Sequence, residues 1–552
     1  TNNVGFSERA DVPIEPRLSE QWFLKYPRLE KSRAVVASGE MKFHPDRWAK
    51  VYDHWMGNLQ DWCISRQLWW GHRIPVWYAK SGKSEIYVGL EPPPGPQNWE
   101  QDPDVLDTWF SSWLWPFATM GWPERTETLK KFYPTTDLVT GPDIIFFWVA
   151  RMIMAGYKFM GEMPFRNVYF TGIIRDKQGR KMSKSLGNSP DPLELIGKYG
   201  ADALRFGTMR SAPLGQDILF DEQNVELGRN FCNKLWNACR FRQMQGGEAQ
   251  GEISPQLLTS DDKWILLKLD TAIREIDAAF AEYRFSDATA TLYRFFWSEY
   301  CDWYIEASKA ALGSAEGVAR SAEQEGRRAN TLAVADFVLS HTLRLFHPFL
   351  PFITEELWHG MGYSEDMPAQ QGGKTVMFSH WPKPLDEDFK KFYGLSEADE
   401  KFIETRNEFI AQGRNLRRNA NLPANKKVKF VLKPAGKTTA NDLEVLKLLL
   451  NAEAVEVNPN FQPGKNVLAV RGEPGELFLP LEGLIDVEAE KARLKKEIEK
   501  CGAEIEKVQS KLNNPNFTQK VPATVLEEHK RRLAEWQEKL AHAKTSLDTL
   551  GN

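Results

Sequence analysis

The residues best suited to chemistry form a short cationic loop. Lys181 and Lys184 are separated by two residues, and the small hydroxyl residues Ser183 and Ser185 alternate with them. The loop follows an apolar run, residues 167–174, whose composition predicts a buried strand. Ligands of open α/β sheets bind beyond the carboxyl ends of strands, where ammonium groups can stabilise charge that develops on a phosphate. For an isolated lysine pair, a solvated basic surface loop is the alternative.

The element that must position this loop is a predicted strand–helix–strand unit between Asp137 and Ile174. At the end of its first strand, Gly141 permits close backbone approach, and Pro142 suits a first helical turn. Asp143 can accept hydrogen bonds from a pair of ribose hydroxyls. From the residues alone, the simpler interpretation is that Asp143 only caps the helix.

Several longer segments carry a family resemblance. The loop 181–185 resembles the signature loop of class I aminoacyl-tRNA synthetases, and 140–152 resembles their ribose-binding segment. Segments 64–75 and 104–112 resemble the valyl-type members, whereas isoleucyl-type members tend to differ at the Trp-Phe-Ser-Ser position. The resemblance covers nearly the whole chain. It implies activation of valine by ATP to valyl-adenylate, followed by transfer to tRNA(Val), which is a valine–tRNA ligase activity. An isoleucyl-type ligase and a non-catalytic tRNA-binding protein stay open as alternatives.

The resemblance also implies roles for single residues. The phosphate-handling residues are Lys181, Ser183, Lys184 and Ser185. The ATP and ribose contacts are Gly141, Asp143, Ile173 and Met182. The valine pocket is lined by Trp109, Ile144 and Trp148, the last two spaced i and i+4 on one predicted helix face. The expected tRNA contacts are Arg414, Arg417, Arg418, Lys507 and Arg531, although a solvated charged face explains these equally well.

Composition limits the remaining possibilities. The formal net charge is −4, so RNA binding must come from local patches rather than a global basic field. The five cysteines are scattered without Cys-x-x-Cys pairing, so zinc and a disulfide framework are not expected. Such a set suits a reducing cytoplasm. No apolar window is long enough for a membrane span. ATP is expected with Mg²⁺ held largely by its own phosphates, and the protein is expected to be a monomer without a protein metal site.

The predicted fold class is multidomain, α/β plus all-α. It combines the second half of a Rossmann-type nucleotide-binding fold, a helical anticodon-binding bundle, a small α/β junction and a C-terminal antiparallel coiled-coil hairpin. The expected boundaries are 1–53 for a connector that returns from an editing insertion, 54–190 for the catalytic half, 191–227 for stem-contact helices, 228–400 for the bundle, 401–486 for the junction and 487–552 for the arm. The hairpin rests on apolar residues at 3–4 spacing from Val487 to Leu512 and from Leu533 to Leu550.

One family motif is absent. The His-x-Gly-His signature of the first half of the nucleotide fold does not occur, because the Gly71-His72 pair belongs to a later motif. We therefore expect the chain to correspond to a C-terminal portion of such an enzyme, without most of the editing domain and without proofreading. A polypeptide that carries the His-x-Gly-His half is an expected partner.

Overall fold

The computed structural model describes residues 4–7, 11–15, 17–82, 85–183, 186–247, 251–313, 320–363, 375–423, 425–436, 438–464, 466–483, 487–514 and 523–551. The chain divides into two compact units, which are described separately. Unit 1 comprises Thr1–Glu194, Thr208–Asn224 and Ala278–Asp287, and unit 2 comprises Leu195–Gly207, Val225–Asp277 and Ala288–Asn552. No helix among these described residues is both long and apolar enough to cross a membrane.

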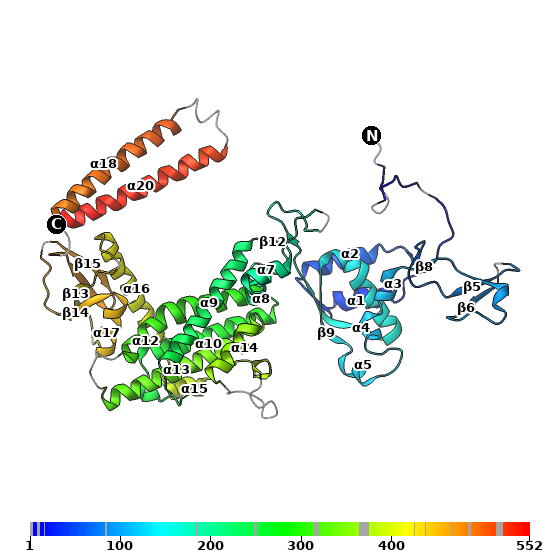
Figure 1. Ribbon diagram of the computed structural model, residues 1–552, viewed down its shortest axis with the longest axis horizontal. Helices are drawn as coiled ribbons and strands as arrows, with labels where there is room; N and C mark the ends of the chain where they lie inside the picture. The colour runs from blue at the N-terminus through cyan, green and yellow to red at the C-terminus, as the bar shows by residue number, and fades with distance from the viewer. Residues whose placement is uncertain are drawn as a thin grey trace. The chain divides into compact units, whose positions relative to one another are not determined.

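Unit 1 is built on a three-stranded parallel sheet of order β2-β10-β9, of which Figure 1 labels β9. Its strands are β2 (Lys42–His44), β9 (Thr135–Thr140) and β10 (Phe165–Phe170). β10 pairs in parallel with both neighbours, and the chain between β9 and β10 is helical, so the predicted strand–helix–strand unit is confirmed. Helices α1 (Leu29–Ala37) and α2 (Arg47–Gly57) contribute to the same apolar core as the sheet and the crossover.

The crossover helix is less regular than its sequence predicts. It starts as the 3-10 turn η2 (Pro142–Ile144) and continues as the π-helical segment η3 (Ile145–Ala150). The α-helix α6 (Arg151–Ala155) and a second π segment, η4 (Gly156–Met160), complete it. π segments are rare and often lie at functional sites. The i, i+4 spacing of Ile144 and Trp148 is therefore not the face of a regular α-helix.

Residues 1–53 contain more structure than the expected connector. They include α1 and β2, and β2 is an integral strand of the parallel sheet. The expected boundary near Asp53 falls inside α2. A three-residue strand is too short to show the alternation that identifies strands in a sequence, which explains why β2 was not predicted.

Short strands and helices surround this sheet. They are β1 (Phe23–Leu24), β3 (Trp62–Cys63), β4 (Ser65–Arg66), β5 (Val76–Ala79), β6 (Ile86–Val88), η1 (Pro96–Asn98), β7 (Trp99–Gln101), β8 (Val105–Leu106), α3 (Thr108–Ser112), α4 (Trp115–Ala118), α5 (Glu127–Phe132), β11 (Ile174–Arg175) and β12 (Ile218–Leu219). β11 and β12 pair in parallel just before the lysine loop. This pairing gives the loop a fixed starting point.

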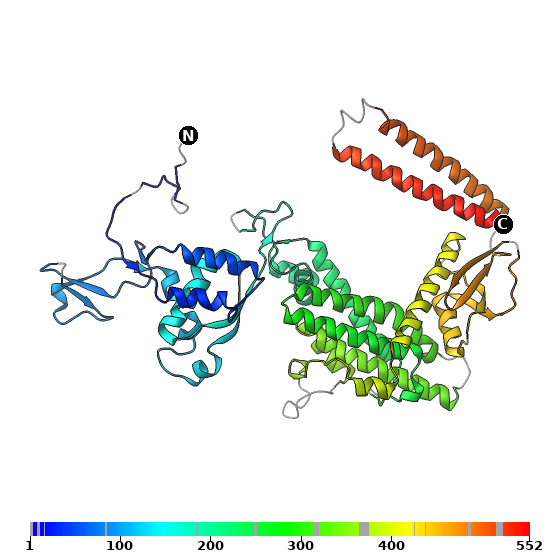
Figure 2. The same ribbon diagram turned by 180° about the vertical axis from the view of Figure 1, so that it is seen from behind.

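Unit 2 begins with a helical bundle, as predicted from its period (Figure 2). Its helices are α7 (Pro192–Tyr199), α8 (Ala201–Arg210), α9 (Glu222–Met244), η5 (Pro255–Leu257), α10 (Ser260–Ala281), α11 (Phe285–Arg294), η6 (Phe295–Ile305), α12 (Glu306–Leu312), α13 (Ala322–Phe346), α14 (Pro351–Met361), η8 (Val376–Phe378), α15 (Glu387–Tyr393) and α16 (Glu397–Asn419). The start of α7, the end of α8, the start of α9, the end of α10 and the start of α11 belong to unit 1. Phe231, Leu235 and Ala238 of α9 are buried, whereas Trp236 on the same helix is exposed.

A four-stranded sheet of order β14-β13-β16-β15 follows the bundle. Its strands are β13 (Val428–Pro434), β14 (Ala452–Val457), β15 (Val467–Gly472) and β16 (Gly475–Pro480), and α17 (Ala440–Leu449) connects the first two. β13 pairs in parallel with β14 and antiparallel with β16. This mixed sheet with its helix agrees with the predicted α/β character of 401–486.

The chain ends in two long helices, α18 (Val487–Leu512) and α20 (Ala523–Gly551), which lie side by side and antiparallel (Figures 1 and 2). Leu494, Cys501 and Val508 of α18 and Ala543 of α20 are buried. Their spacing follows the predicted apolar seam. The structure thus contains a helical hairpin where the sequence predicts one.

Candidate active site

The lysine loop and the ribose-binding segment meet in unit 1. Lys181 Nζ lies 2.9 Å from Asp143 Oδ2, although 38 residues separate them in sequence. Both side chains are exposed by half or more. Asp143 and Ile173 line one cavity, of about 710 Å³, together with Arg47, Trp48 and Trp55 from α2. The structure therefore brings together the residues predicted for phosphate and for ribose.

Two glycines make this close approach possible. A Cβ on Gly141 would lie 2.8 Å from Asp143 Oδ1, which is closer than real contacts allow. A Cβ on Gly172 would lie 1.8 Å from the carbonyl oxygen of Gln216. Any side chain at Gly172 would push the end of β10 away from a segment that lines the cavity. A Cβ at Gly172 would thus meet backbone, whereas a Cβ at Gly141 would meet side-chain atoms, and close backbone approach at Gly141 stays a prediction.

A buried carboxylate organises the lysine loop. Asp176 accepts hydrogen bonds from the backbone N–H groups of Gln178 and Arg180 and from the side chains of Arg180 and Asn188. The amide oxygen of Asn188 in turn accepts from the backbone N–H of Ser183 at 2.9 Å. The bond from Asn188, followed by those from Arg180, lowers the pKa of Asp176 to about 2. The loop is therefore held by charge-assisted bonds at both of its ends.

The remaining loop residues lie in different surroundings. Met182 is partly buried, and its N–H donates to the carbonyl oxygen of Ile174 at 3.4 Å. The N–H of Ile173 donates to Asp217 Oδ1, which with Arg175 lowers the pKa of the Asp217 carboxyl. The predicted residues Lys184 and Ser185 lie outside the described residues.

The predicted amino-acid pocket involves α3 and η3. Trp109 lies on α3 and stacks on Phe147, with ring centroids 6.1 Å apart. Trp148 lies on η3, and its indole N–H donates to the carbonyl oxygen of Ser112 at 3.1 Å. Ile144 is partly buried at the end of η2. α3 and η3 pack together, so both tryptophans belong to one region of unit 1.

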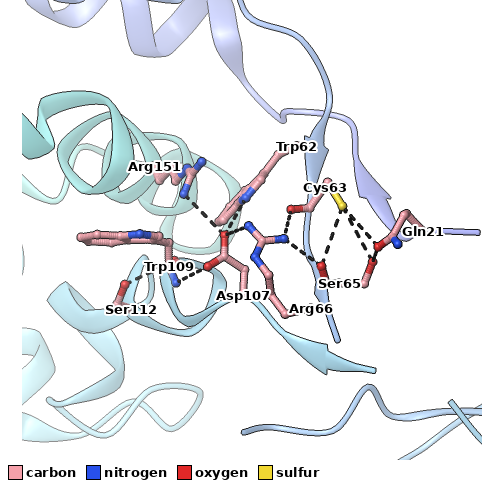
Figure 3. A network of polar contacts seen from close by, with 9 residues as sticks. All are labelled: Gln21, Trp62, Cys63, Ser65, Arg66, Asp107, Trp109, Ser112 and Arg151. Atoms are coloured by element: carbon pink, nitrogen blue, oxygen red, sulfur yellow. Dashed lines mark hydrogen bonds and ion pairs between the residues drawn. The ribbon is translucent and has the colours of Figure 1, made fainter. Parts of the chain in front are cut away.

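A polar network beside this pocket was not predicted from the sequence (Figure 3). Asp107, which is 5% exposed, accepts from the indole N–H of Trp62, from Arg66 and from the backbone N–H of Trp109. Arg151 lies 3.9 Å from the same carboxylate. Three partners of Asp107, namely Trp62, Arg66 and Arg151, lie 41 to 45 residues away in the sequence, and no spacing rule connects residues so far apart. Trp109 lies two residues from Asp107. Only the Asp-Thr pair before the helix, a possible N-cap, signals its position.

The arginines of α16 differ from the expected solvent-facing row. Arg417 is buried, and its guanidinium donates to the carbonyl oxygens of Leu450, Asn451 and Lys426. Burial lowers its pKa. Carbonyls left without partners at a turn must be satisfied, and this guanidinium satisfies them. Arg417 therefore holds the junction together, and we do not retain it as a predicted tRNA contact.

The other expected tRNA contacts reach solvent. Arg414 is exposed, donates to the Leu449 carbonyl and lies over the Trp303 ring. Arg418, Lys507 and Arg531 are exposed, with acidic or amide neighbours on their own helices. Their contact with tRNA stays a prediction.

Comparisons with known proteins agree with this geometry. The family model for class I tRNA synthetases (I, L, M and V) matches residues 6–92 and 94–221. The model for the anticodon-binding domain of tRNA ligases matches 262–432, and that for the valyl-tRNA synthetase tRNA-binding arm matches 486–551.

Two similar proteins are both valine–tRNA ligases. The valine–tRNA ligase of Chlorobaculum tepidum is 43% identical over 100% of this chain, and that of Thermotoga maritima is 45% identical over 100%. The chain spans 61% of the length of each. The methionyl-tRNA synthetase of Mycobacterium tuberculosis, solved with methionyl-adenylate, shares the fold with a TM-score of 0.53 at 19% identity, over 70% of this chain and 72% of that one. The chain thus belongs to the class I aminoacyl-tRNA synthetases, in the valyl-tRNA synthetase family.

Proposed function

We propose that this chain carries the ribose-binding and phosphate-binding part of a valine–tRNA ligase active site, together with the surfaces that bind tRNA(Val). The observation that carries the proposal is the pair formed by Lys181 and Asp143, of which Asp143 lines the unit 1 cavity. One residue suits a phosphate and the other suits a ribose, and ATP presents both groups close together.

The geometry supports an exchange of partners when ATP binds. The Asp143 carboxylate pairs with Lys181 Nζ at 2.9 Å. A ribose hydroxyl pair can replace the ammonium on Asp143, which leaves Lys181 free to move toward the phosphates. Because both side chains are exposed, the pair contributes little to stability, so breaking it costs little. The Asp176–Asn188 anchor keeps the rest of the loop in place during this exchange.

The reaction needs no covalent nucleophile from the protein. The valine carboxylate attacks the α-phosphorus of ATP, the bond to pyrophosphate breaks, and valyl-adenylate forms. The terminal ribose hydroxyl of tRNA then attacks the valyl carbonyl and releases AMP. Catalysis rests on positioning and on stabilisation of phosphate charge by Lys181 and, as predicted from the family loop, Lys184. Mg²⁺ would arrive with ATP, bound largely by the phosphates.

The proposed pocket between Trp109 and Trp148 would select the amino acid by shape. A rigid aromatic slot excludes a larger aliphatic chain by overlap, but it rejects the near-isosteric threonine only about a hundredfold. Valine is therefore the proposed substrate, with threonine as its most frequent competitor.

The test is valine-dependent ATP–pyrophosphate exchange, measured on this chain alone and after mixing with a polypeptide that carries the His-x-Gly-His half of the family fold. Exchange in either preparation that is lost in Lys181→Ala supports the proposal. Exchange in the mixture only would assign the other half as a partner. Absence of valine-dependent exchange in both preparations, with tRNA(Val) still bound, would reject the catalytic proposal in favour of a tRNA-binding protein.

A further inference from the structure

We infer that Asp107 is a positioning residue that sets the gap between Trp109 and Trp148, and thereby the aliphatic side chains that the amino-acid pocket accepts. The inference deepens the proposed function and rests on it, because it concerns the same pocket. Asp107 is 5% exposed and lies in a polar network (Figure 3), and together with Trp109 it lines a cavity of about 600 Å³.

The first step is that α3 depends on its ends for its position. The helix has only five residues, Thr108–Ser112, so its own hydrogen bonds cannot hold it in place. Asp107 is its N-cap, with Oδ1 accepting from the N–H of Trp109 at 3.2 Å. The other oxygen of the same carboxylate accepts from Trp62 at 3.0 Å and from Arg66 at 2.7 Å. One carboxylate therefore ties the start of α3 to two residues of a separate segment.

Helix α3 contacts both tryptophans of the proposed pocket, Trp109 and Trp148. It carries Trp109, and the carbonyl oxygen at its last residue, Ser112, accepts the indole N–H of Trp148. Ser111 on the same helix bonds His72 at 2.9 Å, which restrains the outer side. A shift of α3 therefore moves Trp109 directly and loosens Trp148 through the lost hydrogen bond.

The third step is the charge balance behind the helix. Arg151 is 4% exposed and lies with its guanidinium 3.6 Å from the centre of the Trp62 ring. Its Nε and one terminal nitrogen have no hydrogen-bond partner among the described residues. Burial lowers the pKa of Arg151, and Tyr26 first and the Asp107 charge second oppose this effect. Without the Asp107 charge, Arg66 and Arg151 would repel each other across the network, and the cap would move.

The experiment compares amino-acid selectivity rather than activity alone. We would measure ATP–pyrophosphate exchange with valine, isoleucine and 2-aminobutyrate, in the preparation of wild-type chain that gives exchange. Asp107→Asn keeps the shape of the side chain and removes its charge. Asp104→Asn is the matched control, because Asp104 lies three residues earlier and bonds Gln67 instead of α3.

We expect Asp107→Asn to raise the ratio of kcat/KM for isoleucine over valine about tenfold, which is part of the discrimination that one methylene allows. The KM for valine should rise more than kcat falls, the KM for ATP should stay unchanged, and Asp104→Asn should behave as wild type. Trp148→Phe removes the N–H that bonds Ser112 and keeps an aromatic ring, so it should raise the same ratio. It provides the test if Asp107→Asn does not fold.

An unchanged isoleucine-to-valine ratio in a folded Asp107→Asn, or in Trp148→Phe, with exchange retained, would overturn the inference alone. A parallel rise in the KM for ATP would also overturn it, because it would indicate general damage to the unit. Absence of valine-dependent exchange by the wild-type chain in every preparation would overturn the proposed function and this inference with it.

Discussion

Two ion pairs of this protein, one from each unit, differ in burial. In the unit 2 bundle, Arg242 and Asp336 lie 2.6 Å apart with side chains 6% and 0% exposed, and Tyr363 donates to the same carboxylate. In unit 1, Lys181 and Asp143 lie 2.9 Å apart with side chains 61% and 50% exposed. The distances are similar, whereas the solvent access is not.

This difference in burial separates an ion pair that fixes the fold from an ion pair that can exchange its partners for a ligand. A buried pair leaves an uncompensated charge when one partner is lost, so it fixes the helices that carry it. An exposed pair is screened by water and can open at little cost when a ligand offers better partners. The first kind belongs to the scaffold, and the second kind suits a site where ribose and phosphate must enter.

Removal of the buried Asp336 carboxylate should have the largest effect on stability. Asp336→Ala should lower the free energy of unfolding by about 3–5 kcal/mol, because Arg242 would remain buried without its partner. Denaturant titration followed by circular dichroism measures this loss. Asp302→Ala removes a partly exposed pair with Lys234 in the same bundle and should cost less than about 1 kcal/mol. Equal losses in the two variants would refute the distinction.

At the exposed pair, activity and stability should separate. Lys181→Ala should reduce valine-dependent exchange by about 10²–10³-fold, the size of one lost electrostatic stabiliser. Its unfolding free energy should change by less than about 1 kcal/mol. Lys177→Ala is the matched control, because Lys177 pairs with Asp221 at 3.3 Å on the same approach to the loop. Comparable activity loss in that control would assign the effect to general surface charge.

The anchor of the loop predicts a dependence on acid. The pKa of Asp176 is about 2, below the ordinary value of an aspartate, so its bonds stabilise the loop fully above about pH 4. That stabilisation is lost as the pH falls through 2. The side-chain amide resonances of Asn188, followed by NMR from pH 6 downward, should report the loss. Asp176→Asn should abolish the transition, while Asp191→Asn, at the start of α7, should preserve it.

The smallest expected effect is on the arm. Lys507→Gln should weaken tRNA(Val) binding severalfold at low salt and reduce the slope of log K against log salt by about 1. Filter binding at several salt concentrations measures both quantities. Lys447→Gln is the control, because Lys447 is also an exposed lysine paired three residues away, but in the junction. An identical slope for both variants would exclude Lys507 as a phosphate contact.

The sequence predicted the elements that repeat or alternate over many residues. The crossover between β9 and β10 and the bundle have long apolar periods, and both were found. The antiparallel helices α18 and α20 lie where the hairpin was predicted, and its coiled-coil form stays a prediction. Family resemblance assigned Lys181 to phosphate and Asp143 to ribose, whereas spacing alone left Asp143 as a helix cap, and the contact between the two side chains was not predicted. Both residues lie after strand ends, where the chain reverses.

What the sequence could not predict depends on distant partners. Asp107 meets Trp62 and Arg66 across more than 40 residues, and no local pattern connects them. The sequence did not distinguish Arg417 from its exposed neighbours, because the charge of an arginine does not show that it donates to three backbone carbonyl oxygens in the interior. The π-helical form of Ile145–Ala150 was equally hidden, since apolar spacing does not distinguish it from an α-helix.

Calorimetric titration with a non-hydrolysable valyl-adenylate analogue measures whether Asp143 and Lys181 bind an adenylate. The titration would use the chain alone and with the His-x-Gly-His polypeptide. The account predicts tighter binding of the valyl than of the isoleucyl analogue, and at least a tenfold loss in Asp143→Ala. Equal affinity for both analogues, or an affinity that Asp143→Ala leaves unchanged, would contradict it.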